Sequence, residues 1–198
     1  MSDEKKLRNW AVLESRTLLS AEPFFSVRAE RVALPDGREV ADYYQIDLAP
    51  FVCIFAETED GRILVIRQYK HGARRVSLTF PGGAIEAGEA AYDAARRELR
   101  EETGYEAGRW VSLGEYANNA NQGCGRAHLF IAKECRQVCQ PESGDLEEMQ
   151  VMAMHLEDIM AAAKRGEFVL LNQFTLLSLA THPDLLAALA EEVNHAEG

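Results

Sequence analysis

Three glutamates on one predicted helix are the residues of this chain best suited to chemistry. Glu98, Glu101 and Glu102 are spaced at i, i+3 and i+4, so at about 100° per residue they share one arc of a helix. That arc borders an apolar stripe that includes Leu99. Three carboxylates at the edge of a buried face repel one another, and leaving them unpaired would cost several kcal/mol. A bound divalent cation would remove that cost.

A glycine-rich segment precedes the acidic helix. Residues 81–88 contain one proline and three glycines, and the helix expected over 90–103 is ended by Gly104. Mg²⁺ is usually held by a few carboxylates together with waters and phosphate oxygens, and Mn²⁺ accepts the same ligands. By itself an acidic helix is more often a solvated face. The adjoining glycine loop favours a site for Mg²⁺, or alternatively Mn²⁺, and phosphate.

This segment resembles the Nudix box, Gx5Ex7REUxEExGU, in which U is a bulky aliphatic residue. Tyr105 is the one departure, at a packing position. The resemblance implies an α/β/α sandwich with a mixed sheet, and an enzyme that hydrolyses a nucleoside diphosphate linked to another group, X. The matching residues are Gly83, Glu89, Arg97, Glu98, Leu99, Glu101, Glu102 and Gly104.

The resemblance also implies roles for individual residues of the box. Glu98 and Glu102 match the main metal-binding carboxylates, Glu101 shares their cluster, and the carbonyl of Gly82 is a further candidate ligand. Glu101 is also a catalytic candidate.

Gly83, Glu89 and Arg97 match positions with a structural role. The pair Glu89 and Arg97 is expected to form a salt bridge that holds the loop against the helix. Helical geometry places Arg97 well round the helix from the acidic arc.

Two segments outside the box supply further candidates. The segment Arg67-Gln68-Tyr69-Lys70 resembles one that contacts phosphate in the ADP-ribose pyrophosphatase branch, so Arg67 and Lys70 are substrate-binding candidates. Members of this branch also supply a carboxylate from a loop before a late strand. Here that loop offers Glu147 as the first choice of catalytic residue, with Asp145 and Glu148 as alternatives.

The N-terminal segment resembles the small β subdomain that, in this branch, packs on a second subunit and helps to bind the nucleotide. A homodimer is therefore expected. Trp10 or Phe24 would stack on the base, because a flat apolar ring suits a flat base, although each is more often a core residue. Asn121 is a candidate for a sugar or base contact by analogy.

Alternating runs and turn residues indicate strands followed by helices. We expect a β subdomain over 1–48, whose second strand contains a bulge or is buried on both faces, and a Nudix domain over 49–198. The Asn- and Gly-rich residues 118–125 are expected to form a loop. Strands are predicted at 11–19, 24–34, 39–48, 51–56, 63–69, 76–80, 110–116, 127–132 and 149–154, and helices at 90–103, 156–164, 172–181 and 183–193.

Charge and composition exclude several classes of partner. The formal net charge of -11 argues against nucleic acid and anionic membranes, which need clustered Lys and Arg. No apolar run has the length of a membrane span or an export signal, so we expect a cytoplasmic protein with reduced cysteines.

The sequence thus predicts Mg²⁺-dependent hydrolysis of ADP-ribose or a related nucleotide sugar. Ser-Pro-Gly after the box and Glu-Leu-Pro-Ala-Gly before it, both usual in ADP-ribose pyrophosphatases, are missing here. Two alternatives therefore stay open: a hydrolase of other nucleoside diphosphate-X substrates such as dinucleotides and dinucleoside polyphosphates, and a Nudix-fold sensor that binds a nucleotide without cleaving it.

Overall fold

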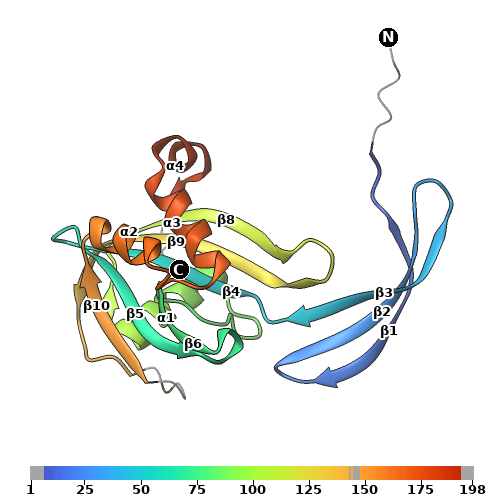
Figure 1. The fold of residues 1–198 in the computed structure, drawn as a ribbon, viewed down its shortest axis with the longest axis horizontal. Coiled ribbons are helices and arrows are strands. Elements are labelled where there is room, and N and C mark those ends of the chain that lie inside the picture. Colours follow the sequence, from blue (N-terminus) through green and yellow to red (C-terminus); the bar gives the residue numbers. More distant parts are fainter. Residues whose placement is uncertain (1–6, 143, 145–147, 193–198) are drawn as a thin grey trace, which may run out of the picture. The chain divides into compact units, whose positions relative to one another are not determined.

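The computed structural model describes residues 7–142, 144 and 148–192; for residues 191 and 192 it describes the backbone alone. The chain divides into two compact units. The first unit comprises residues 1–49 and 117–126. Its three strands form an antiparallel meander in the order β1-β2-β3 (Figure 1). Between Glu30 and Val32 the register of β2 against β3 shifts by one residue, and the extra residue lies in β3, between Val40 and Tyr43, rather than in the second strand as expected. The strands are β1 (Ala11–Ala21), β2 (Phe25–Ala33) and β3 (Glu39–Leu48).

The second unit, residues 50–116 and 127–198, is built on a mixed sheet. Strand β4 pairs parallel with β9, and β5 pairs antiparallel with β4, β6 and β10. Two short strands, β7 and β11, pair with β9 and β8. The strands are β4 (Phe51–Thr58), β5 (Ile63–Lys70), β6 (Arg75–Thr79), β7 (Tyr105–Glu106), β8 (Arg109–Asn119), β9 (Gly123–Gln137), β10 (Met149–Met154) and β11 (Glu191–Glu192).

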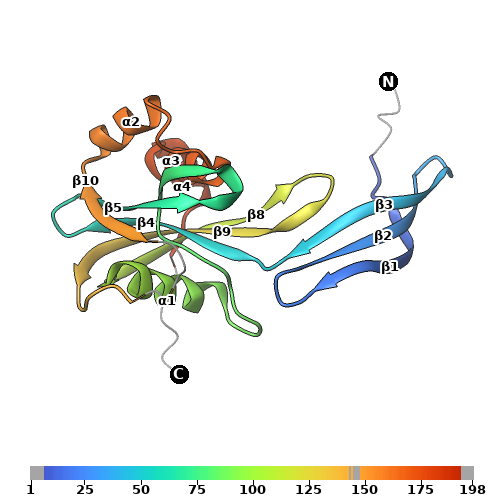
Figure 2. The ribbon, with the colours of Figure 1, turned by 60° about the horizontal axis from the view of Figure 1, so that its bottom comes forward.

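Helices cover both faces of this sheet, because its central strands are apolar on both sides (Figure 2). In β4, Val52 and Ile54 face α1, whereas Cys53 and Phe55 face α2 and α3. The α/β/α sandwich with a mixed sheet is confirmed. The helices are α1 (Ala91–Thr103), α2 (Leu156–Lys164), α3 (Leu171–Thr181), α4 (Pro183–Leu189) and a 3-10 turn at His71–Ala73. Among the described residues, no helix combines the length and the apolar character needed to cross a bilayer.

Several predicted boundaries are wrong, most of all that of β9, which spans Gly123–Gln137 rather than 127–132. The loop expected over 118–125 is a turn of residues 120–122, because β8 and β9 continue almost to its tip. Asn119 Oδ1 accepts hydrogen bonds from the backbone N–H groups of Asn121 and Gln122, both at 2.8 Å, so the asparagine closes the turn. The last helix ends at Leu189 rather than at 193, since Ala190 is extended and residues 191–192 pair with β8.

Candidate metal-phosphate site

The glycine loop lies beside β4 and is held there by backbone hydrogen bonds. The N–H of Val52 donates to the carbonyl of Gly83, and that of Ile54 to the carbonyl of Pro81, both at 2.9 Å. The loop therefore runs alongside β4 and pairs with it as a short additional strand would. This fixes where its own amide and carbonyl groups point.

Glu102 binds this loop from helix α1. Its side chain is buried, and Oε2 accepts a hydrogen bond of 2.7 Å from the backbone N–H of Gly82. Gly82 has a φ of 150°, and a Cβ there would overlap the carbonyl oxygen of Val52. Only glycine fits between the strand and the carboxylate.

Glu98 approaches the same loop one turn earlier on α1. A Cβ added to Gly83 would lie 2.6 Å from both carboxylate oxygens of Glu98, so the absence of a side chain at Gly83 makes room for this carboxylate. Glu98 and Glu102 therefore converge on consecutive glycines. The glycine pair and the acidic helix form one site.

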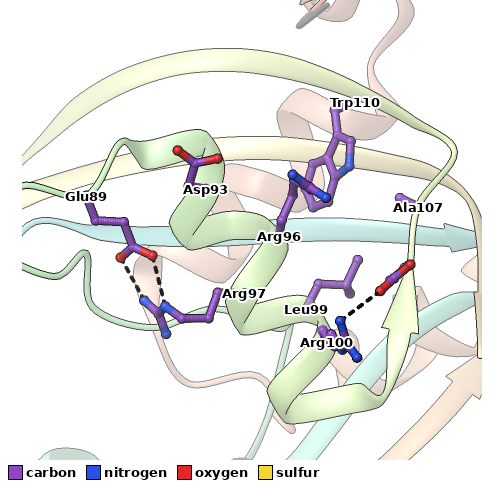
Figure 3. A pocket seen from close by; sticks show the side chains of 9 residues that line it. Glu89, Asp93, Arg96, Arg97, Leu99, Arg100, Ala107 and Trp110 are labelled. Carbon is purple, nitrogen blue, oxygen red and sulfur yellow. Dashed lines mark hydrogen bonds and ion pairs between the residues drawn. The ribbon is translucent and has the colours of Figure 1, made fainter. Parts of the chain in front are cut away.

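Arg97 links the loop to the acidic residues. Its Nε and Nη2 each donate to Glu89 at 2.9 Å, and Nη2 also donates to the carbonyl of Ala84 at 3.0 Å. The ion pair that the resemblance implies is thus present, at one end of a pocket of about 450 Å³ (Figure 3). Its hydrogen bonds hold the pKa of Glu89 below, and that of Arg97 above, their usual values.

The expectation that Arg97 lies away from the acidic arc is wrong. Its Nη1 is 2.7 Å from Glu98 Oε1 and 3.1 Å from Glu101 Oε2. Helical spacing fixes the direction of a Cβ, but the long arginine side chain bends so that its guanidinium reaches Glu98 and Glu101. The positive charge of Arg97 therefore reduces the repulsion between the carboxylates of Glu98 and Glu101.

The donor chemistry fits a hard divalent cation. Glu98 and Glu102 supply carboxylate oxygens. The space that a Cβ on Gly83 would fill lies directly beside the Glu98 carboxylate. Among the described residues, no three His, Cys, Asp or Glu side chains are arranged as a ready cage for a metal ion. An ion held here would thus take part of its coordination from water and substrate, as Mg²⁺ commonly does.

Two pockets lie along β10, and one of them borders this site at Glu102. The first, about 590 Å³, is lined by Glu102 and by the first residues of β10; the second, about 530 Å³, is lined by Arg67 and Glu148. Both share Met149 and Gln150, so the start of β10 connects the acidic helix to Arg67.

The second pocket gathers charged and polar groups. Arg67 Nη2 forms a 2.9 Å ion pair with Glu167, which orients its guanidinium, and Glu148 supplies a carboxylate. Gln68 also lines this pocket; its Nε2 donates to Thr79 Oγ1 at 2.8 Å, and its Oε1 is buried without a hydrogen-bond partner among the described residues. Gln68, Met149 and Gln150 were not among the site residues predicted from the sequence.

The remaining candidates come from elements other than α1 and the glycine loop. Lys70 ends β5, opposite Arg75. Trp10 packs edge-on against Tyr43, and Phe24 is strongly exposed in the turn before β2. Together with Asn121, whose carbonyl accepts a 2.8 Å hydrogen bond from Gln45, they belong to the first unit. Asp145 and Glu147 lie outside the described residues.

Comparison with family models assigns both parts of the chain. A model of the NUDIX domain matches residues 47–172, and a model of the nucleoside diphosphate sugar hydrolase N-terminal domain matches residues 10–46. The first alone spans more than half of the chain, and the sandwich carries an intact acidic box. The protein is thus a Nudix hydrolase by class: the chain belongs to the NUDIX family.

Individual relatives agree with this assignment. The chain is 29% identical over 161 residues to an ADP-ribose pyrophosphatase of Bacillus subtilis (strain 168), covering 78% of this chain and 86% of the relative. It is 28% identical over 167 residues to an ADP-ribose pyrophosphatase of Mycobacterium tuberculosis, covering 81% and 78%. A crystal structure of an ADP compounds hydrolase superposes with a TM-score of 0.74 at 22% identity, over 89% of this chain and 94% of that one, which shows a shared fold.

Proposed function

We propose that this Nudix hydrolase cleaves the phosphoanhydride bond of ADP-ribose or a related nucleoside diphosphate sugar, giving a nucleoside monophosphate and a sugar phosphate. The convergence of Glu98 and Glu102 on the Gly82–Gly83 loop carries the proposal. Mg²⁺, with Mn²⁺ as the alternative, is the cofactor that this carboxylate pair would hold, with Glu101 and the carbonyl of Gly82 as further ligands. When bound, the ion would neutralise phosphate charge and lower the pKa of a water.

The side chains beside the carboxylates have distinct tasks in this reaction. Arg67, oriented by Glu167, would neutralise a phosphate oxygen, and Lys70 is a second candidate for the same task. A carboxylate of the 145–148 loop would accept the proton of the attacking water. Glu147 stays the first choice and Asp145 and Glu148 the alternatives; Glu148 lines the same pocket as Arg67.

The substrate class rests on the N-terminal domain match and on the relatives. The matched model describes the N-terminal domain of nucleoside diphosphate sugar hydrolases, and two relatives are ADP-ribose pyrophosphatases. We further propose a cytoplasmic homodimer formed through the N-terminal strands, with Trp10, Phe24 and Asn121 contacting the nucleotide. This dimer would explain why a three-stranded meander with many exposed apolar residues is retained.

The test is a product analysis. The protein is incubated with Mg²⁺ and a panel of ADP-ribose, other nucleotide sugars, NADH, dinucleoside polyphosphates and nucleoside triphosphates. Release of AMP and ribose 5-phosphate from ADP-ribose at the highest kcat/KM supports the proposal, and EDTA should abolish it. Preferred turnover of dinucleotides would replace the sugar assignment, whereas tight binding of a nucleotide without turnover would establish a sensor.

A further inference from the structure

A buried glutamine outside the acidic box holds the start of the glycine loop. Gln173 lies in the first turn of α3 and is 4% exposed. Its Oε1 accepts a 2.6 Å hydrogen bond from the backbone N–H of Phe80, and its Nε2 donates to Cys53 Sγ at 3.4 Å. Phe80 directly precedes Pro81. Because a buried amide left without hydrogen-bond partners is strongly disfavoured, this pairing is favoured.

Gln173 complements the hydrogen bonds that β4 makes to the loop. The N–H groups of Val52 and Ile54 hold the carbonyls of Gly83 and Pro81. Cys53, between them, faces the opposite side of the sheet, where it meets α3. The loop is therefore anchored through two of its carbonyls by β4, and through the amide at its entry by Gln173.

The anchored loop in turn contacts the two carboxylates. Gly82 N–H donates to Glu102 Oε2 at 2.7 Å, and Gly83 lies against Glu98. Burial raises the pKa of Cys53 to about 12, with a smaller contribution from the negative charge of Glu102. The thiol thus stays neutral, and its sulfur accepts the hydrogen bond from Gln173 Nε2.

We propose that Gln173 is a positioning residue of the hydrolase site, whose side-chain amide fixes Phe80 and thereby presents the Gly82 N–H to Glu102. The inference rests on the proposed function in one respect, namely that Glu98 and Glu102 hold the metal ion. It extends the active site to α3, which lies about 70 residues beyond the acidic helix in the sequence. Gln173 itself touches neither substrate nor metal.

The test measures metal binding and turnover separately. Gln173→Met keeps the length of the side chain but removes both hydrogen bonds. We expect Mn²⁺ affinity, followed by electron paramagnetic resonance of free Mn²⁺ without substrate, to fall about 10-fold, the lower end of the effect of residues that orient metal ligands. The Mg²⁺ concentration for half-maximal activity should rise by a similar factor, and kcat should fall at saturating substrate with little change in KM.

Three variants make the outcome decisive. Gln173→Asn retains an amide one methylene too short and should act in the same direction, which covers the case in which Gln173→Met does not fold. Cys53→Ser keeps an acceptor for Nε2 and should bind Mn²⁺ like the original chain. Thr181→Val removes a 2.7 Å hydrogen bond to Leu177 within the same helix, so it should lower the unfolding temperature without changing Mn²⁺ affinity.

The Mn²⁺ affinities and the product analysis together separate a failure of the Gln173 inference from a failure of the proposed function. Mn²⁺ affinities of Gln173→Met and Gln173→Asn within twofold of the original chain would overturn the positioning role, whatever their unfolding temperatures. If the original chain binds Mn²⁺ but cleaves none of the tested nucleotides, the proposed substrate fails while Mn²⁺ binding still decides the role of Gln173. If the original chain binds no Mn²⁺, both proposals fail.

Discussion

At the scale of single residues, the site depends on a glycine beside the Glu98 carboxylate. Gly83 has to be small because a Cβ would lie 2.6 Å from the Glu98 carboxylate. In Gly83→Ala the loop or Glu98 must shift, so we expect Mn²⁺ affinity and kcat/KM to fall about 10-fold or more. Gly72→Ala is the matched control, because a Cβ there meets open space. Equal Mn²⁺ affinities of the two variants would refute the close approach.

The two convergent carboxylates should matter more than other glutamates of the same region. Glu98→Gln and Glu102→Gln keep the shape of the side chain but remove its charge, and we expect each to lower kcat/KM on the order of 100-fold. Glu106→Gln is the control, since Glu106 pairs with Arg100 at the surface. Steady-state kinetics at several Mg²⁺ concentrations provide the measurement. Activity of Glu102→Gln close to that of the control would remove Glu102 from the metal site.

At the scale of elements, the pair Arg97 and Glu89 ties the glycine loop to α1. Arg97 holds the pKa of Glu89 below its usual value, about 4.3. A lowered carboxyl pKa stabilises the fold above that usual value, and the contribution is lost as the pH falls through the lowered one. Urea unfolding between pH 7 and pH 3 should therefore show a smaller loss of stability on acidification for Arg97→Met than for the original chain.

Two further measurements accompany this prediction. At pH 7, Arg97→Met should reduce the free energy of unfolding by about 2 kcal/mol, because charged hydrogen bonds to partly buried partners are lost. Arg100→Met removes an exposed pair with Glu106 and should leave the pH dependence unchanged. Parallel stability curves for Arg97→Met and the original chain would show that this pair does not link the loop to the helix.

The elements themselves could largely be predicted from the sequence, whereas their side-chain partners could not. Residues 51–56 were predicted to form a strand, and in β4 Val52 and Cys53 face different helices because the run is apolar on both sides. The Asn-rich turn was predicted too long, because composition does not reveal that the hydrogen bonds of the Asn119 side chain close it within three residues. The role of Gln173 could not be predicted from the sequence, because its hydrogen bond with Phe80 joins segments that are distant in the sequence.

At the scale of the whole molecule, the first unit exposes more apolar surface than an isolated sheet tolerates. Strand β1 is exposed along nearly its whole length and lies at the edge of the meander, with Val12, Leu18 and Leu19 each at least 44% exposed. A long apolar edge strand promotes aggregation unless a partner covers it. A second copy of this chain would supply that cover in the proposed dimer.

The dimer leads to a direct prediction about one residue of this strand. Leu19 is 51% exposed, and Leu19→Glu would place a charge in the proposed interface, where desolvation disfavours it. We expect the original chain to sediment as a dimer at micromolar concentration and Leu19→Glu as a monomer, with catalysis weakened through KM because nucleotide contacts from the N-terminal strands are lost. A monomeric original chain, or a Leu19→Glu variant that stays dimeric, would refute an interface at this strand and leave its apolar surface to another partner.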